Sequence, residues 1–231
     1  MGPKGKSEVT EVEQLQPLGD QAALAYFTDE TAALCFARAA RAIPDSWLLD
    51  VVQAYASVAV FFDLNRTHYA VVADRLQQLA GETAQQGKPT AGRLHSIPCC
   101  YEFQLDLERV GVQTGLAPEE VIRLHVETEY VVYAIGFCPG FPYLGYLPPA
   151  LCSVPRLPTP RLRVEPGSVG LTGRQTGIYT EARPGGWNLI GRTPLELVNV
   201  ADGYFPLRTG DRVRFARIDE AEHRRLLGKR L

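Results

Sequence analysis

The sequence lacks the segments that would direct the chain into or through a membrane. No stretch approaches the roughly 18–20 uninterrupted apolar residues that a transmembrane helix needs. The opening, residues 1–14, is polar and has no apolar core of the kind found in a secretory signal. The formal net charge is −2, and no basic tail is present for nucleic acid. We therefore expect a cytoplasmic protein that binds neither membranes nor nucleic acids.

Cysteine is scarce and poorly placed for a disulfide framework. The five cysteines are an odd number, and Cys99 and Cys100 are adjacent. No CxxC motif or His/Cys cluster has zinc-ligand spacing, so we expect free thiols and no metal site. The nucleophile motif GxSxG is also missing. Residues 167–177, GSVGLTGRQTG, fail the spacing of a phosphate-binding loop and contain no lysine.

The first part of the sequence predicts a small α+β domain over residues 10–88. Apolar runs at 22–27, 49–52 and 58–62 indicate strands. Asp29 is placed to cap a helix that continues to about residue 42, and a second helix follows from about residue 67. This β-α-β-β-α order is typical of a ferredoxin-like sandwich. The stretch 84–93 is polar and reads as the linker to a second domain.

The second part, residues 94–231, predicts a β-barrel with small helices. Twenty of the 38 glycines and prolines of the chain fall between Gly136 and Glu196, and short apolar segments separate them. Frequent turns between many short strands are typical of a closed barrel. A helix is predicted over 118–125, where Pro118 opens it and His125 closes it. Strands are predicted at 97–101, 130–137, 168–172, 177–180, 187–190, 195–200 and 212–218.

Charge and aromatic residues concentrate in the same part of the chain. Between Arg156 and Arg192 there are six arginines, no lysine and two acidic residues. Because arginine presents a planar fork of donors, this excess favours a site for a small anion. The alternative is that the arginines solvate barrel strands and pair with acids. Trp187 likewise fits either a core position or a flat ligand wall, and His125 fits either a general base or a structural histidine.

Four long motifs in the second part carry a family resemblance. They are YAIGFCPGFPYLG (133–145), PRLPTPR (155–161), PGSVGLTGRQTGIYT (166–180) and PGGWNLIGRTP (184–194). The sequence resembles the family of 5-oxoprolinase B subunits, also described as Kip-type kinase inhibitors or allophanate hydrolase subunit 1. The resemblance covers nearly the whole chain and is weakest in the first part. Thr180 stands where the family usually has proline. Residues 102–107, EFQLDL, lack an expected glycine-containing turn, which leaves the role of that loop open.

The resemblance implies a cyclophilin-like barrel and a heteromeric complex with A and C subunits. Such a complex opens 5-oxo-L-proline to L-glutamate with hydrolysis of ATP, and one chain alone is expected to be inactive. His125 and Arg192 are the implied catalytic residues. The implied substrate-binding residues are Gly140, Phe141, Tyr143, Arg156, Arg161, Gln175, Tyr179 and Trp187.

Two other functions are compatible with the same motifs. One is inhibition of a sporulation-type sensor histidine kinase, and the other is a role in urea or allophanate metabolism. We rank the oxoprolinase function first, because a pure inhibitor would not need an intact set of site motifs.

Overall fold

The computed structural model describes residues 12–83, 92–152 and 154–231. The chain divides into two compact units, Met1–Thr90 and Ala91–Leu231. Residues 84–91 of the predicted linker lie outside the described residues, as do residues 1–11 of the polar opening. The predicted domain limits, 10–88 and 94–231, therefore stay predictions.

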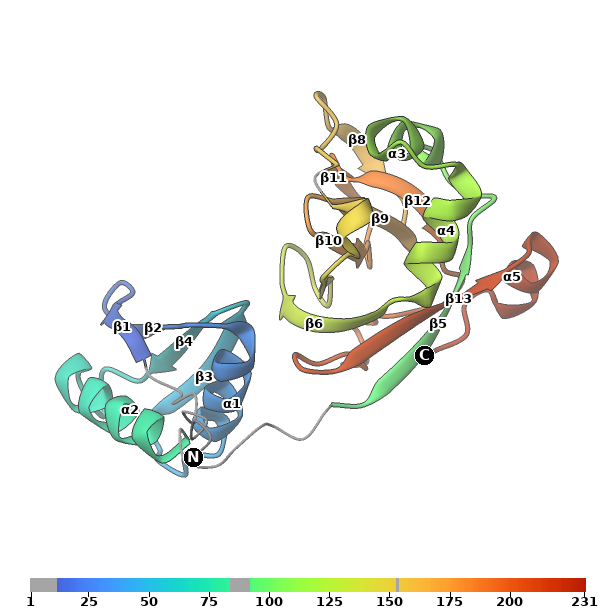
Figure 1. Ribbon diagram of the computed structural model, residues 1–231. Coiled ribbons are helices and arrows are strands. Elements are labelled where there is room, and N and C mark those ends of the chain that lie inside the picture. Colours follow the sequence, from blue (N-terminus) through green and yellow to red (C-terminus); the bar gives the residue numbers. More distant parts are fainter. Residues whose placement is uncertain (1–11, 84–91, 153) are drawn as a thin grey trace, which may run out of the picture. The chain divides into compact units, whose positions relative to one another are not determined.

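The first unit is a four-stranded antiparallel sheet with two helices. Its elements are β1 (Val12–Pro17), β2 (Ala22–Phe27), α1 (Glu30–Arg41), β3 (Leu48–Ala54), β4 (Ser57–Phe62) and α2 (Tyr69–Thr83). The strand order is β1-β2-β4-β3. Helices α1 and α2 contact each other, α1 also contacts β3 and β4, and α2 contacts β1 and β2, so the helices share one face of the sheet (Figure 1).

Local signals explain this unit well. The Asp29 carboxylate accepts a hydrogen bond from the Ala32 backbone at 2.8 Å, which is the predicted N-cap of α1. Val72, Leu76 and Leu79 form the buried face of α2. Strand β1 was not predicted, and it precedes the predicted β-α-β-β-α order. The ferredoxin-like description of this unit stays a prediction.

The second unit contains a closed barrel of seven strands, as predicted (Figure 1). In order around the barrel these are β6 (Glu129–Ile135), β13 (Arg212–Ile218), β5 (Leu94–Cys100), β12 (Asn188–Arg192), β9 (Ser168–Thr172), β10 (Gln175–Ile178) and β7 (Pro142–Gly145). Pairing of β7 with β6 closes the ring. The finer assignment to the cyclophilin-like barrels stays a prediction.

Several short elements surround the barrel. They are α3 (Leu107–Thr114), α4 (Pro118–Glu127), the 3-10 turn η1 (Pro149–Leu151), the ribbon of β8 (Arg161–Val164) with β11 (Arg183–Gly185), and α5 (Glu220–Leu226). Helix α4 packs on β13 and α3 packs on β12. The core is built by alternation, since Val213 and Phe215 of β13 are buried while Arg214 is exposed.

One predicted strand is wrong. Residues 195–200 form no continuous strand and instead make isolated bridges, from Glu196 to Arg230 and from Asn199 to Tyr204. The Glu196 backbone N–H donates to the Lys229 carbonyl at 2.8 Å. Glu196 therefore pairs far along the chain and Asn199 pairs locally, and the apolar alternation of the segment reveals neither partner.

Candidate functional site

Four predicted site residues meet in one aromatic cluster, which we define as Phe141, Tyr143, Tyr179 and Trp187. Their rings pack edge to face around Phe141, whose centroid lies 4.9 Å from Tyr143, 5.3 Å from Tyr179 and 5.5 Å from Trp187. Phe141, Tyr179 and Trp187 are buried and Tyr143 is half-buried. They form a small core of their own, separate from the main barrel core.

Two glycines make this close packing possible. A Cβ atom at Gly177 would lie 2.9 Å from both the Trp187 ring and the Pro142 carbonyl oxygen. A Cβ atom at Gly185 would lie 2.3 Å from the Tyr179 hydroxyl. Real Cβ atoms do not tolerate such contacts, so the glycines let backbone lie directly against the rings.

The phenols of the aromatic cluster are neutral donors next to a cation. Burial raises the pKa of Tyr143 and of Tyr179, and the positive charge of Arg156 opposes that shift in both. Arg156 is exposed and has no ion-pair partner in the part of the chain that the structure describes. Two neutral phenols are therefore close enough to a free guanidinium to feel its charge, an arrangement suited to a carboxylate.

Arg161 has a structural partner that the sequence did not reveal. Its Nη2 atom donates to Asp106 Oδ1 at 2.7 Å, while Asp106 Oδ2 accepts the Leu189 backbone N–H at 2.7 Å. Asp106 is buried. Its carboxylate thus links β8 to β12 by hydrogen bonds. This gives Asp106 a structural role, whereas the sequence left the role of its loop open. Arg161 Nη1 is buried without a partner among the described residues.

A pocket lies beside the aromatic cluster. It has a volume of about 390 Å³. It is lined by Pro166, Gly167, Tyr179, Thr180, Arg192, Thr193, Pro194, Leu195, Glu196, Leu197, Val198, Leu227 and Gly228. Gly140, with φ +67°, packs so tightly on this wall that a Cβ atom would lie 2.2 Å from Val198 Cγ2. The pocket, Arg192 and the loop holding Gly140 are thus neighbours.

Thr180, the departure from the family pattern, joins two site loops. Its hydroxyl donates to the Pro139 carbonyl at 2.7 Å and lies 3.4 Å from the Cys138 sulfur. Proline could make neither contact, since it has no side-chain donor. The substitution therefore strengthens the link between the CPGFP loop and the end of β10.

His125 lies away from this region, in the main barrel core. It is fully buried between Tyr130 and Phe215. The ring accepts at Nδ1 from the Tyr101 hydroxyl (2.7 Å) and donates at Nε2 to Thr176 Oγ1 (3.0 Å). The second contact has this direction because the Thr176 hydroxyl donates to the Gly170 carbonyl at 3.0 Å.

This chain of hydrogen bonds requires a neutral imidazole. Burial lowers the pKa of His125 to about 3. Both ring nitrogens are occupied, so no face is open to a substrate. The geometry gives His125 a structural role and argues against the predicted catalytic one. The neighbouring Gln175 begins β10, pairs with Gly145 and Thr172, and belongs neither to the aromatic cluster nor to the pocket lining.

Two adjacent cysteines, Cys99 and Cys100, are buried in the barrel. Burial raises the pKa of Cys100 to about 11 and that of Cys99 further, so these thiols stay protonated. Among the described residues, no group of three His, Cys, Asp or Glu side chains is arranged to hold a metal ion. No helix in the described ranges is long and apolar enough to cross a membrane.

Comparison with known proteins places the chain in a family. Residues 13–204 match the carboxyltransferase domain, subdomains C and D. The B subunit of the Bacillus subtilis 5-oxoprolinase is 36% identical over 229 residues, which covers 91% of this chain and 95% of that protein. The Haemophilus influenzae protein of the same name is 40% identical over 171 residues, covering 73% and 78%.

Solved structures agree at the level of the fold. TTHA0988 is 36% identical with a TM-score of 0.74 over 87% of this chain. The urea amidolyase of Kluyveromyces lactis has a TM-score of 0.73 at 16% identity, which shows the fold alone. This chain spans 40% of the TTHA0988 chain and 15% of the urea amidolyase chain. The chain is 36% identical to the Bacillus protein over nearly the full length of both, and it matches the carboxyltransferase domain over residues 13–204. It therefore belongs to the family of 5-oxoprolinase B subunits.

Proposed function

We propose that this chain is the B subunit of an ATP-dependent 5-oxoprolinase in the cytoplasm. The observation that carries the proposal is the 36% identity over 95% of a relative that is named as a 5-oxoprolinase B subunit. In the reaction, the lactam C–N bond of 5-oxo-L-proline breaks and water supplies the oxygen of the new carboxylate of L-glutamate. ATP hydrolysis drives the step, because a five-membered lactam is a poor electrophile.

Within such a complex, this chain supplies a binding surface. The aromatic cluster offers a rigid apolar wall, and Arg156 offers an unpaired cation beside two phenol donors. The predicted base of this chain, His125, is buried and neutral, so it cannot activate a nucleophile for the substrate. We therefore infer that the A and C subunits bring the remaining catalytic groups and the ATP site.

The two alternative functions have weaker support, and only the urea-pathway function is loosely consistent with a structural neighbour. The fold likeness to urea amidolyase is at 16% identity and does not extend to its reaction. Nothing among the described residues points to a histidine kinase.

Reconstitution tests the proposed function. The purified chain alone is expected to release no glutamate from 5-oxoproline and ATP, and addition of its cognate A and C subunits is expected to restore release. The Bacillus subtilis proteins, assayed in parallel, provide a positive control. Activity of the chain alone would refute the dependence on partners. An inactive three-subunit mixture beside an active control would refute the function itself.

Within the active complex, Arg156→Gln is expected to lower kcat/KM for 5-oxoproline by about tenfold or more. The physical reason is the loss of a charge-assisted hydrogen bond to the substrate carboxylate. Arg163→Gln is the matched control, because Arg163 is an exposed arginine nearby that pairs with Glu165. Equal kcat/KM values for the two variants would remove Arg156 from the substrate site.

A further inference from the structure

The pocket beside the aromatic cluster has a wall that comes from a distant part of the sequence. Leu227 and Gly228 line it together with residues 194–198. Two backbone hydrogen bonds hold these segments together, from Gly228 N–H to the Pro194 carbonyl (3.0 Å) and from Glu196 N–H to the Lys229 carbonyl (2.8 Å). The volume of about 390 Å³ lies in the range of small-molecule sites.

Arg192 is the unpaired cation of this pocket. Its Nε atom donates to the Pro166 carbonyl at 3.1 Å, which fixes the direction of the side chain. Within the described ranges its terminal Nη atoms have no hydrogen-bond or ion-pair partner. Four of the five other arginines of the 156–192 segment are engaged, three with acids and Arg174 over the ring of Tyr146. Arg192 therefore keeps a positive charge and free donors at the pocket.

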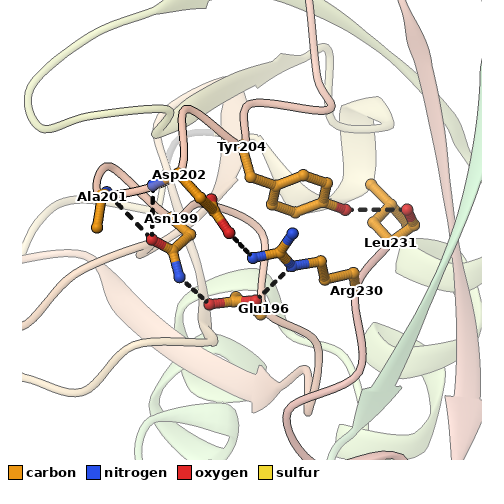
Figure 2. A network of polar contacts seen from close by, with 7 residues as sticks. All are labelled: Glu196, Asn199, Ala201, Asp202, Tyr204, Arg230 and Leu231. Carbon is orange, nitrogen blue, oxygen red and sulfur yellow. Dashed lines mark hydrogen bonds and ion pairs between the residues drawn. The ribbon is translucent and has the colours of Figure 1, made fainter.

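Glu196 is the acidic residue that lines the pocket, and its carboxylate pairs with Arg230, which lies outside the lining. Figure 2 shows the Arg230 network, which consists of Glu196, Asn199, Asp202, Tyr204 and Arg230. Arg230 Nε donates to Glu196 Oε2 at 2.8 Å, and Nη2 donates to Asp202. The Arg230 guanidinium also lies 4.5 Å above the Tyr204 ring.

The Arg230 network holds the Glu196 carboxylate on both oxygens. Asn199 Nδ2 donates to Glu196 Oε1 at 2.8 Å, on the side that Arg230 leaves free (Figure 2). These hydrogen bonds, first that of Arg230 and then that of Asn199, lower the pKa of Glu196. The carboxylate is therefore ionised, and both of its oxygens are engaged within the Arg230 network.

Two other titratable groups near Arg192 are Glu165 and His223. Glu165 pairs with Arg163 at 2.6 Å, and its pKa is lowered first by that hydrogen bond and less by the charge of Arg192. His223 of α5 is buried, and burial followed by the charge of Arg192 lowers its pKa, so it is neutral at neutral pH. Its Nε2 atom has no partner in the described part of the chain.

We propose that this pocket binds a small oxyanion, phosphate or carboxylate, on the guanidinium of Arg192, and that Arg230 holds the Glu196 carboxylate away from the anion. Arg192 supplies charge-assisted hydrogen bonds to the ligand. Arg230 is a positioning residue that acts through Glu196, since it does not line the pocket itself. The site uses Arg192 and not Arg156, although Tyr179 belongs both to its lining and to the aromatic cluster. Its test does not depend on the oxoprolinase reaction.

Direct binding to the full chain, without other subunits, tests this proposal. Inorganic phosphate and 5-oxoproline are titrated separately by calorimetry at constant ionic strength. Comparing the two titrations shows whether the pocket binds a phosphate or a carboxylate. We expect one of them to bind, and Arg192→Gln to raise its Kd by about tenfold or more. Absence of binding by both compounds, or an unchanged Kd in Arg192→Gln, would overturn the proposal.

The role of Arg230 is tested by removing its charge and then the charge of Glu196. Arg230→Gln is expected to raise the Kd by about threefold to tenfold, because the freed Glu196 carboxylate then faces the anion. Adding Glu196→Gln in the same chain is expected to restore the Kd, which a purely structural role of Arg230 would not allow. Arg225→Gln is the control, as it breaks the Arg225–Glu222 pair on α5 outside the pocket. A double variant as weak as Arg230→Gln would refute the role of Arg230.

Discussion

Replacing Trp187 with alanine is expected to lower the free energy of unfolding by about 3–5 kcal/mol, the usual cost of removing a buried aromatic side chain. The indole is 5% exposed and packs edge to face on Phe141 and Tyr143. Gly177 lies directly against it, so the backbone has no side chain with which to fill the cavity. Urea denaturation of the purified chain measures the change.

Phe137→Ala is the matched control for this experiment. Phe137 touches the same aromatic cluster, with its ring centroid 5.4 Å from Phe141, but is 58% exposed. Its removal is expected to cost less than about 1 kcal/mol. If Trp187→Ala cost no more than the control while activity of the complex was lost, the indole would be a ligand wall and its core role would be wrong.

The second large effect is a loss of stability in acid that originates at His125. The unfolded chain takes up a proton on this imidazole below pH 6.5, whereas burial holds the folded pKa at about 3. A histidine with a lowered folded pKa contributes its full stability above pH 6.5 and loses it as the pH falls. The loss is about 1.4 kcal/mol per pH unit, or about 2 kcal/mol at pH 5.

His125→Gln isolates this contribution. Glutamine keeps a donor and an acceptor for the Thr176 and Tyr101 hydroxyls but has no titration. We expect the difference in unfolding free energy between pH 7.5 and pH 5 to be smaller in the variant by about 2 kcal/mol. His68→Gln removes an imidazole from an exposed position and serves as the control. An identical pH dependence in His125→Gln and wild type would show that the folded protein protonates His125.

Secondary structure was predictable where its cause is local. Strand β13 follows from the alternation of Arg212–Ile218, and α1 follows from the Asp29 cap. Residues 195–200 have the same alternation but form no strand, because Glu196 bonds with Lys229 and Arg230. Short elements without a pattern, such as β7 and β8, were missed for the same reason, since their partners in the sheet define them.

The aromatic cluster and the arginine excess could both be anticipated from the sequence. Dense glycine and proline around aromatic residues indicate rigid loops, and six arginines without lysine indicate a surface for an anion. The family motifs then indicated the individual site residues. The sequence by itself thus determined which stretches of the second unit supply the aromatic rings and the arginines, and it predicted the anion chemistry that we propose for them.

Only the tertiary structure decided what each charged residue does. Arg161 and Arg192 are equivalent in the sequence, yet Arg161 pairs with Asp106, which is 55 residues away, and Arg192 keeps its terminal donors free. His125 matches a family histidine, yet Tyr101 and Thr176 occupy both of its nitrogens. Pairing and burial depend on neighbours that the barrel brings together. A charged partner that is distant along the chain cannot be recognised from the residues adjacent in sequence.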